Sequence, residues 1–330
     1  MKKLSLFLGM ALAASLSLTN CAEKIEGPIA PATPAGIPFE ISADISTKTI
    51  NNGLATQWAE GDAINLFHAE AGAAGYVSDG EFKLDATRDG VFTGNLSSAL
   101  ETSTSYDWYA FYPYSEYNKT PAGVSKETFG YTHIGDKSQT QVGNDSKAHL
   151  CGATLPLYGV VKGLASDVKP AVTMNNLASV VAVKVKNTTT EPLVVKSVSF
   201  TSTEDIVGTY YIDFTGENVV YTGSGDKYVS ATASLTVNNG EAIAANSEAT
   251  FYIPIKPHSV AAGKTLKISV NGCKKSLALT KDVTFAAGRI KTLAFNYVDY
   301  VTIPWAEDFS GDLSLYTLVS KTSTTKTYDE

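Results

Sequence analysis

The sequence predicts an all-β protein that contains two tandem antiparallel β-sandwich domains. Apolar and polar residues alternate with a period of two in short segments, and Gly, Pro, Asn and Asp separate these segments. The chain has 330 residues, of which 44% are hydrophobic and 18% are charged, so it is long enough for about two cores at about 150 residues each. Helical periodicity is confined to the stretches 96–101 and 166–168, which we expect to be turns.

The N-terminal segment predicts export. Two lysines precede an apolar run over residues 4–18, which is too short to be a comfortable membrane span. The sequence from Leu18 to Cys21 resembles a bacterial lipobox, and this resemblance implies removal of a signal peptide over residues 1–20, lipidation of Cys21 and attachment to the outer membrane. Because Asn20 departs from the small residue usual before the cysteine, an ordinary secretory signal with an incidental cysteine is the alternative.

A proline-rich stretch over residues 21–38 follows the predicted signal peptide. Spaced prolines favour an extended backbone, and no apolar face repeats along this stretch. The prolines are Pro28, Pro31, Pro34 and Pro38. We expect a tether that would hold a folded body away from the membrane.

Regular alternation predicts individual strands in the second half of the chain. Over residues 181–186, valines alternate with an alanine and two lysines, which gives one apolar and one polar face, as in an antiparallel sandwich. The same pattern predicts strands over 251–255, 266–270 and 293–297. Because Pro254 has no N–H group, we expect it at the edge of a sheet or at the end of a strand.

The composition of the chain changes near residues 163–170. Aromatic residues and Gly are frequent before this point, whereas Val, Thr and Lys are frequent after it. We therefore predict an N-terminal sandwich domain over residues 39–164 and a C-terminal one over residues 165–299, each within the usual size of a domain. Residues 300–330 would form a tail or the truncated start of a further module.

Aromatic residues are concentrated in one segment of the first predicted domain. Tyr106, Trp108, Tyr112 and Tyr114 are candidate glycan-contact residues, because aromatic faces match the C–H faces of pyranose rings. Further aromatic residues between them occupy the opposite face of the same strand, which instead favours a strand buried on both faces. The exposure of these rings decides between the two alternatives.

No catalytic residue, metal site or cofactor site is predicted, and we expect no enzyme. The histidines lie in unrelated segments, no GxSxG nucleophile motif occurs, and the three cysteines form no CxxC pair. Two adjacent acidic pairs, Glu204-Asp205 and Glu307-Asp308, are typical of solvated loops. We expect the histidines at the surface or in turns; they are His68, His133, His149 and His258.

The charge of the chain argues against a nucleic-acid partner. The net charge is −7, and the only two arginines are Arg88 and Arg289. Nucleic-acid binders rely on many bidentate arginine contacts, for which this chain has almost no donors.

Two cysteines lie outside the N-terminal segment. Cys151 and Cys273 fall in different predicted domains, so a disulfide between them is not expected. We predict two buried free thiols.

Several segments, in their order along the chain, resemble the fimbrillin family of Bacteroidales lipoproteins. Together they span about residues 40–298. The resemblance implies a lipid-anchored surface protein with two transthyretin-like β-sandwich domains, which serves as a pilus subunit, an anchor or accessory subunit, or an adhesin. The segments are Thr47-Lys48-Thr49, residues 58–67 (WAEGDAINLF), 90–94 (GVFTG), 106–114, 174–181 (MNNLASVV), 285–289 (FAAGR) and 293–295 (LAF).

The resemblance also implies assembly by β-strand exchange with other such subunits or with a second copy. In fimbrial members of the family, a protease that cuts after arginine removes the N-terminal segment and frees a groove, which a donated strand then fills. This chain departs from that pattern, because no arginine lies between Cys21 and Trp58. Lys24 and Lys48 are the candidate cleavage sites for another protease.

Residues 304–312 resemble the opening of jelly-roll adhesion or carbohydrate-binding modules of Bacteroidetes surface proteins. The final segment is too short to build such a module. It is the truncated start of one, a tail that pairs with a sheet edge, or a disordered terminus. The alternative function is therefore a surface lipoprotein that binds a host or bacterial glycan through the aromatic residues of the first domain or through a downstream module.

Overall fold

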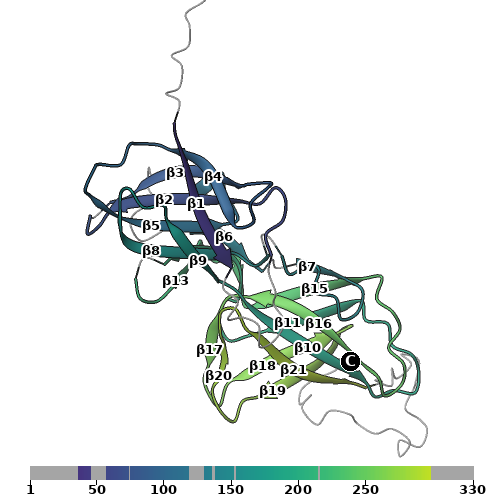
Figure 1. Cartoon of the computed structure of the whole chain (residues 1–330). Coiled ribbons are helices and arrows are strands. Elements are labelled where there is room, and N and C mark those ends of the chain that lie inside the picture. The colour runs from purple at the N-terminus through teal and green to yellow at the C-terminus, as the bar shows by residue number, and fades with distance from the viewer. Residues whose placement is uncertain are drawn as a thin grey trace, which may run out of the picture. The chain divides into compact units, whose positions relative to one another are not determined.

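The computed structural model describes residues 36–45, 57–73, 75–118, 130–135, 138–151, 154–214 and 216–298 (Figure 1). These residues form strands β1 to β21 and one short 3-10 helix, η2 (Glu116–Asn118). The prediction of an all-β protein is confirmed for this part of the chain. Within the same residues, no helix is long and apolar enough to cross a membrane.

Seven strands close into a barrel in the order β1-β4-β3-β2-β5-β8-β9. Neighbouring strands are antiparallel except for β1 and β9, which run parallel. The sequence predicts a sandwich here, and a barrel forms instead because β1 pairs with β4 on one side and with β9 on the other. The strands are β1 (Ile37–Ile45), β2 (Ala63–Glu70), β3 (Val77–Leu84), β4 (Val91–Leu96), β5 (Ser105–Tyr112), β8 (Leu157–Ala165) and β9 (Ala171–Asn176).

The remaining strands form four further sheets. One has five strands in the order β19-β18-β11-β15-β7, and another has three in the order β16-β10-β21. Strand β12 pairs with β13, β14 and β6, and β17 pairs with β20. The bounds are β6 (Gly130–Ile134), β7 (Ser138–Val142), β10 (Ser179–Asn187), β11 (Ser197–Thr201), β12 (Val207–Asp213), β13 (Val220–Gly223), β14 (Val229–Ser230), β15 (Thr232–Asn238), β16 (Glu248–Ile255), β17 (His258–Val260), β18 (Thr265–Val270), β19 (Cys273–Ala278), β20 (Val283–Phe285) and β21 (Ile290–Tyr297).

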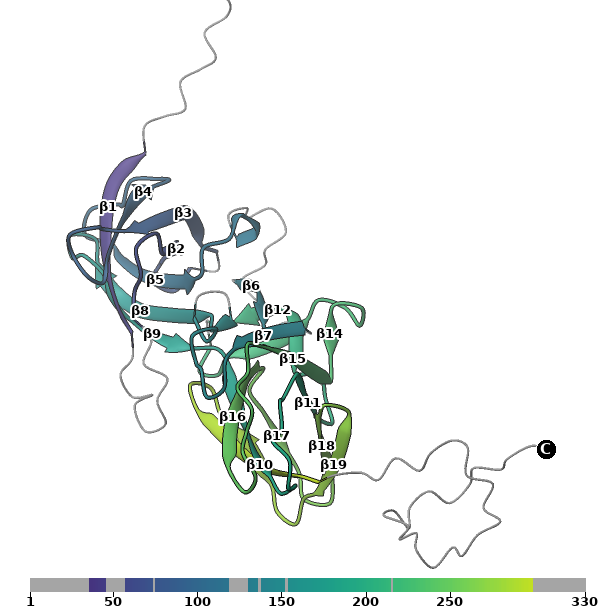
Figure 2. The same ribbon diagram turned by 90° about the vertical axis from the view of Figure 1, so that its right-hand side faces the viewer.

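An apolar core lies between the five-stranded and three-stranded sheets. Figure 2 shows β10 and β16 in one layer and β11, β18 and β19 in the other. Val181 and Val183 of β10, Phe200 of β11 and Ile268 of β18 are fully buried in this core. Alternation in the sequence therefore predicts these strands correctly, because it reports the face of each that lies in this core. Val180 and Ala182, on the other face of β10, are buried as well.

The strands predicted over 181–186, 251–255, 266–270 and 293–297 are all confirmed. Pro254 lies next to the end of β16, which is an edge strand of its sheet, as its missing N–H group predicts.

Two sheets contain parallel neighbours where the sequence predicts only antiparallel ones. β10 runs parallel to β21, and β15 runs parallel to β7. Each pair joins segments that are far apart in the sequence, and a local pattern of apolar residues carries no information about such partners.

Strand β5 is buried on both faces. Tyr106, Trp108 and Tyr112 lie in the barrel core, whereas Tyr109 and Phe111 belong to a second apolar cluster on the opposite face of the strand. The alternative that the sequence favours for this aromatic run is confirmed.

The predicted domain boundary between residues 164 and 165 stays a prediction. Strand β8 ends at Ala165, and β9, which follows it, still belongs to the barrel. Strands β6 and β7 come earlier in the chain but pair with β12 and β15.

Candidate functional site

Strand β1 is held in the barrel from two sides, and we treat its position as the candidate functional site. Residues 37–42 pair with residues 91–96 of β4, and residues 42–45 pair with residues 171–174 of β9. The Ala43 N–H donates to the carbonyl oxygen of Gly90 over 2.7 Å. Removal of β1 would leave unpaired N–H and C=O groups on both neighbouring strands.

Alternate side chains of β1 point into the barrel core. Ile41 and Ala43 are fully buried, and Phe39 and Ile45 pack against the same apolar cluster. The ring of Phe39 stacks on that of Trp108, with 5.0 Å between ring centroids and 10° between planes. β1 is therefore a source of core side chains as well as a partner in the ladder.

A glycine lies directly opposite Phe39 in the β1–β4 pair. A Cβ atom on Gly94 would lie 2.8 Å from both the carbonyl oxygen of Glu81 and the ring of Phe82. These separations are too short for a side chain, so β4 needs glycine at this position to let the Phe82 ring pack beneath it.

Trp58 also binds β1, although it does not belong to a strand that pairs with β1. Its Nε1 group donates a hydrogen bond of 2.7 Å to the carbonyl oxygen of Ala43. Its ring contacts those of Phe92 and Tyr112 edge-on, with centroids 4.8 Å and 5.2 Å away. The indole thus connects β1 to β4 and β5.

The outward face of β1 carries an ion-pair cluster. The Glu40 carboxylate pairs with Lys169, which precedes β9, and with Arg88 over 3.0 Å. The hydrogen bonds from Lys169 and then Arg88 hold the pKa of Glu40 below its usual value. Arg88 also binds Asp85 over 2.7 Å. Glu40 of β1 is therefore contacted by one cation near β4, Arg88, and by one near β9, Lys169.

The predicted glycan-contact residues do not form an exposed platform. Tyr106, Trp108 and Tyr112 are only 3%, 1% and 5% exposed, and Tyr114 is half-buried. The faces of the first three rings are covered by core side chains, so they offer no surface on which a sugar could stack. Because these rings are buried, they cannot form the exposed stacking surface on which the predicted glycan contact depends.

The other predicted site residues lie outside the described part of the chain. They are the lipidation candidate Cys21 and the cleavage candidates Lys24 and Lys48.

Two histidines that we expect at the surface or in turns are buried in strands, and for them that expectation is wrong. His68 in β2 is 3% exposed, and its Nδ1 atom lies 2.6 Å from Oδ2 of the buried Asp79 in β3. The carboxylate satisfies the ring nitrogen that burial removes from water. His258 in β17 is 9% exposed. His133 is exposed and His149 is half-buried.

The environment of His258 resembles half of a catalytic triad but lacks the orienting carboxylate. Its Nε2 atom lies 2.7 Å from Oγ of Ser202, and its Nδ1 atom lies 2.9 Å from the carbonyl oxygen of Lys256. The Lys256 carbonyl can only accept, so Nδ1 carries the proton and donates to it. Nε2 therefore accepts a hydrogen bond from the Ser202 hydroxyl. A main-chain carbonyl replaces the orienting carboxylate, and Ser202 is itself buried. Burial also lowers the pKa of His258.

The two cysteines differ in their surroundings. Cys273 is buried and carries a free thiol, as the sequence predicts. Cys151 also carries a free thiol but is exposed, so the prediction of burial is wrong for this residue. It lies in a turn region between β7 and β8, where the neighbouring strands do not cover it.

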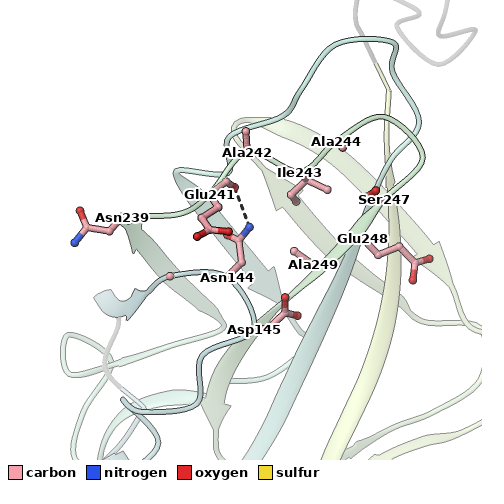
Figure 3. A pocket seen from close by; sticks show the side chains of 11 residues that line it. Asn144, Asp145, Asn239, Glu241, Ala242, Ile243, Ala244, Ser247, Glu248 and Ala249 are labelled. Carbon is pink, nitrogen blue, oxygen red and sulfur yellow. Dashed lines mark hydrogen bonds between the residues drawn. The ribbon is translucent and has the colours of Figure 1, made fainter.

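A hollow of about 500 Å³ lies beside the N-terminal end of β16 (Figure 3). Several of its polar groups are engaged: Asp145 Oδ1 accepts the Thr250 N–H over 2.8 Å, Asn144 Nδ2 donates to the carbonyl of Glu241 over 2.8 Å, and Glu248 pairs with Lys184. In the part of the chain that the structure describes, Asn144 Oδ1 is buried without a hydrogen-bond partner. No histidine or cysteine lines it. Among the described residues, no group of three or more His, Cys, Asp or Glu could hold a metal ion.

Sequence reasoning missed two buried glutamines of β7. Gln139 Nε2 donates to the carbonyl oxygen of Pro254 over 3.1 Å. Gln141 Nε2 donates to that of Thr250 over 3.2 Å, and its Oε1 accepts the Tyr252 N–H over 2.9 Å. These side chains bind the edge of β16 as a neighbouring strand would. The run SQTQV lacks apolar alternation, so no signal marks it as buried.

No protein-family model and no curated protein matches the chain. Solved structures do match the chain. A "putative cell adhesion protein" from Bacteroides ovatus is 17% identical, with a TM-score of 0.49 over 79% of this chain and 93% of its own. A fimbrial protein from Bacteroides ovatus is 13% identical, with a TM-score of 0.38 over 78% of this chain and 48% of its own. The fimbrial anchor protein Mfa2 from Porphyromonas gingivalis is 15% identical, with a TM-score of 0.37 over 74% and 83%. These structures are from Bacteroidales, the group that the sequence resemblance names.

Proposed function

We propose that this protein is a fimbrillin-like surface lipoprotein that assembles with other β-rich subunits by strand exchange, in which a strand donated by a second copy or by another subunit replaces its first strand. The observation that carries the proposal is the position of β1, which closes the barrel by itself between β4 and β9. The ordered set of fimbrillin-like segments in the sequence supports it. In this proposal the protein is not an enzyme, and the lipid on Cys21 anchors it to the outer membrane.

Loss of β1 would create a complete acceptor site. The edges of β4 and β9 would present unpaired main-chain groups, and the space left by Phe39, Ile41 and Ala43 would expose the apolar barrel core. An extended strand with the same alternation satisfies both needs at once. A donor from a second copy or from another subunit therefore has a defined slot.

The two candidate cleavage sites have different consequences. Lys48 follows the last residue of β1, Ile45, so a cut there separates β1 from the rest of the barrel. Lys24 precedes β1, so a cut there leaves the strand attached. Strand exchange in this protein therefore requires cleavage at or near Lys48. The transthyretin-like character of the two domains, and the choice between stalk, tip and anchor subunit, belong to the same proposal.

The test is limited trypsin digestion of the purified protein, followed by size-exclusion chromatography and negative-stain microscopy. We expect polymers after cleavage of the wild type and of Lys24→Gln, and monomers from Lys48→Gln. An excess of a synthetic peptide with the sequence of residues 37–45 should suppress the polymers. A monomer that persists after cleavage at Lys48 and release of β1, confirmed by mass spectrometry, overturns the exchange mechanism.

The glycan-binding alternative through the first-domain aromatics receives no support, because Tyr106, Trp108 and Tyr112 are buried. The downstream jelly-roll segment lies outside the described residues.

A further inference from the structure

The outer face of the five-stranded sheet is built almost entirely from hydroxyl side chains. Strand registers align these residues in rows across the strands. The inward positions between the rows, such as Phe200, Leu235 and Ile268, are fully buried, which places the rows on the opposite, outward face. One row is Ser138, Ser234, Ser199, Ser269 and Lys274; a second is Thr232, Thr201, Lys267 and Ser276; a third is Thr140, Thr236 and Ser197.

The spacing of this surface suits an extended polar ligand. Adjacent strands of a sheet lie about 4.8 Å apart, so successive hydroxyls in a row recur at about that interval, which is comparable to the length of one pyranose ring. A hollow of about 450 Å³ lies over β11, β15, β18 and β19, with both Lys267 and Lys274 at its margin. A cavity of this size accommodates a small-molecule-sized portion of a ligand.

Most of these hydroxyls are available to a ligand. Thr201 and Thr232 share one hydrogen bond of 2.9 Å between their hydroxyls. Within the described part of the chain, no hydrogen bond to another protein group engages the hydroxyls of Ser199, Ser234 and Ser269. Each can donate one hydrogen bond and accept two, as the hydroxyl groups of a sugar require.

The charge of this face is opposite to that of the protein as a whole. The chain carries a net charge of −7, yet the three rows hold two lysines and no carboxylate. Lys267 and Lys274 are exposed, and within the described residues neither has a carboxylate within 4 Å. They lie diagonally on neighbouring strands, where residues are about 7–8 Å apart, so two anionic groups along one chain could bind both.

We infer that this face, the hydroxyl face, binds an anionic polysaccharide. Lys267 and Lys274 pair with its carboxylate or sulfate groups, and the serine and threonine rows bind its hydroxyls. A protein partner fits less well, because protein interfaces are enriched in aromatic residues, Met and Arg and depleted in Lys and Ser. A nucleic acid fits less well still, because two lysines neutralise few phosphates.

The experiment is affinity electrophoresis of the full-length protein in gels that contain polygalacturonate, dextran sulfate or neutral dextran. We expect retardation by the two anionic polymers and none by dextran. Lys267→Gln/Lys274→Gln should weaken binding about fivefold to tenfold, since each exposed ion pair contributes modestly. The matched control is Lys162→Gln/Lys227→Gln, which removes the same charge from exposed lysines of β8 and of the loop before β14 and should leave binding within about twofold.

A second variant separates sugar recognition from charge alone. Ser199→Ala/Ser269→Ala keeps both lysines and should weaken binding to polygalacturonate about threefold or more. All variants change partly or fully exposed side chains, so their unfolding midpoints should match that of the wild type. Equal loss in both lysine variants, unchanged binding in Ser199→Ala/Ser269→Ala, or equally tight binding of polyglutamate, which would indicate an acidic protein partner, each overturns the inference.

Discussion

Replacement of Ile41 by alanine measures how firmly β1 belongs to the barrel core. Ile41 is fully buried, and the substitution removes three carbon groups, which corresponds to about 2.4 kcal/mol of transfer free energy at about 0.8 kcal/mol for each buried group. The cavity that remains beside Phe39 and Ala43 adds to this cost, so we expect a loss of about 3–4 kcal/mol in the free energy of unfolding. The matched control is Ile37→Ala in the same strand, because Ile37 is 42% exposed and should lose less than about 1 kcal/mol.

The assay for this prediction is urea unfolding followed by tryptophan fluorescence. Trp108 stacks on Phe39 and Trp58 binds the carbonyl of Ala43, so both indoles report on β1. If Ile41→Ala and Ile37→Ala lose similar stability, then β1 does not supply the barrel core, and the acceptor slot that we derive from it does not exist.

Three further predictions test other parts of the fold. Gly208→Ala should destabilise by more than about 2 kcal/mol, because Gly208 has a φ of +122° and a Cβ there would lie 2.0 Å from a carbonyl oxygen, whereas Gly75→Ala, with open space around it, should be nearly neutral in the same urea titration. Gln141→Ala should cost about 1–3 kcal/mol and accelerate hydrogen exchange of the Tyr252 amide, and unchanged exchange would argue against the glutamine contact. Burial lowers the pKa of His258, so the unfolded chain takes up a proton near pH 6.5 that the folded protein does not; stability should fall from pH 7 to pH 5, and His258→Asn should reduce this fall, as urea midpoints at both pH values will show.

Local pattern predicts the strands of this protein well and their partners poorly. The valines of β10 and the apolar residues of β18 alternate because one face of each strand lies in the core between the two sheets, and that information is present within six or seven residues. The parallel neighbours β1 and β9 are separated by most of the barrel sequence, so no short-range signal specifies them. The pairing of β1 with β9 closes the barrel. Because the sequence does not signal this pairing, it predicts an open sandwich instead.

The buried polar groups could be anticipated only in part. His68 follows Leu66 and Phe67 in an apolar run, the same feature that predicts burial of β5 on both faces, and this signal was available. Its partner Asp79 lies in a polar stretch, where nothing local distinguishes it from a solvated residue. The glutamines of β7 likewise derive their role from the edge of β16, more than a hundred residues away in the chain. Satisfaction of a buried polar group depends on a distant donor or acceptor, and such partners are a property of the fold.

Attachment of β1 to the barrel protects its slot from exchange. A covalent link holds β1 at an effective concentration of about 1 mM, whereas a donor from a second molecule competes at its actual concentration, about 1 μM in a typical assay, which is a thousandfold advantage for β1. Ile41→Ala would weaken the fit of β1 by about 3 kcal/mol, or about a hundredfold, and so does not remove this advantage.

The uncleaved Ile41→Ala protein should therefore remain monomeric at micromolar concentration, yet polymerise faster than the wild type once cut at Lys48, because only then does the weaker strand compete without its link. Polymer growth by the uncleaved variant, followed by light scattering, would show that the connection through residues 46–56 does not retain β1, and that cleavage is not what controls assembly.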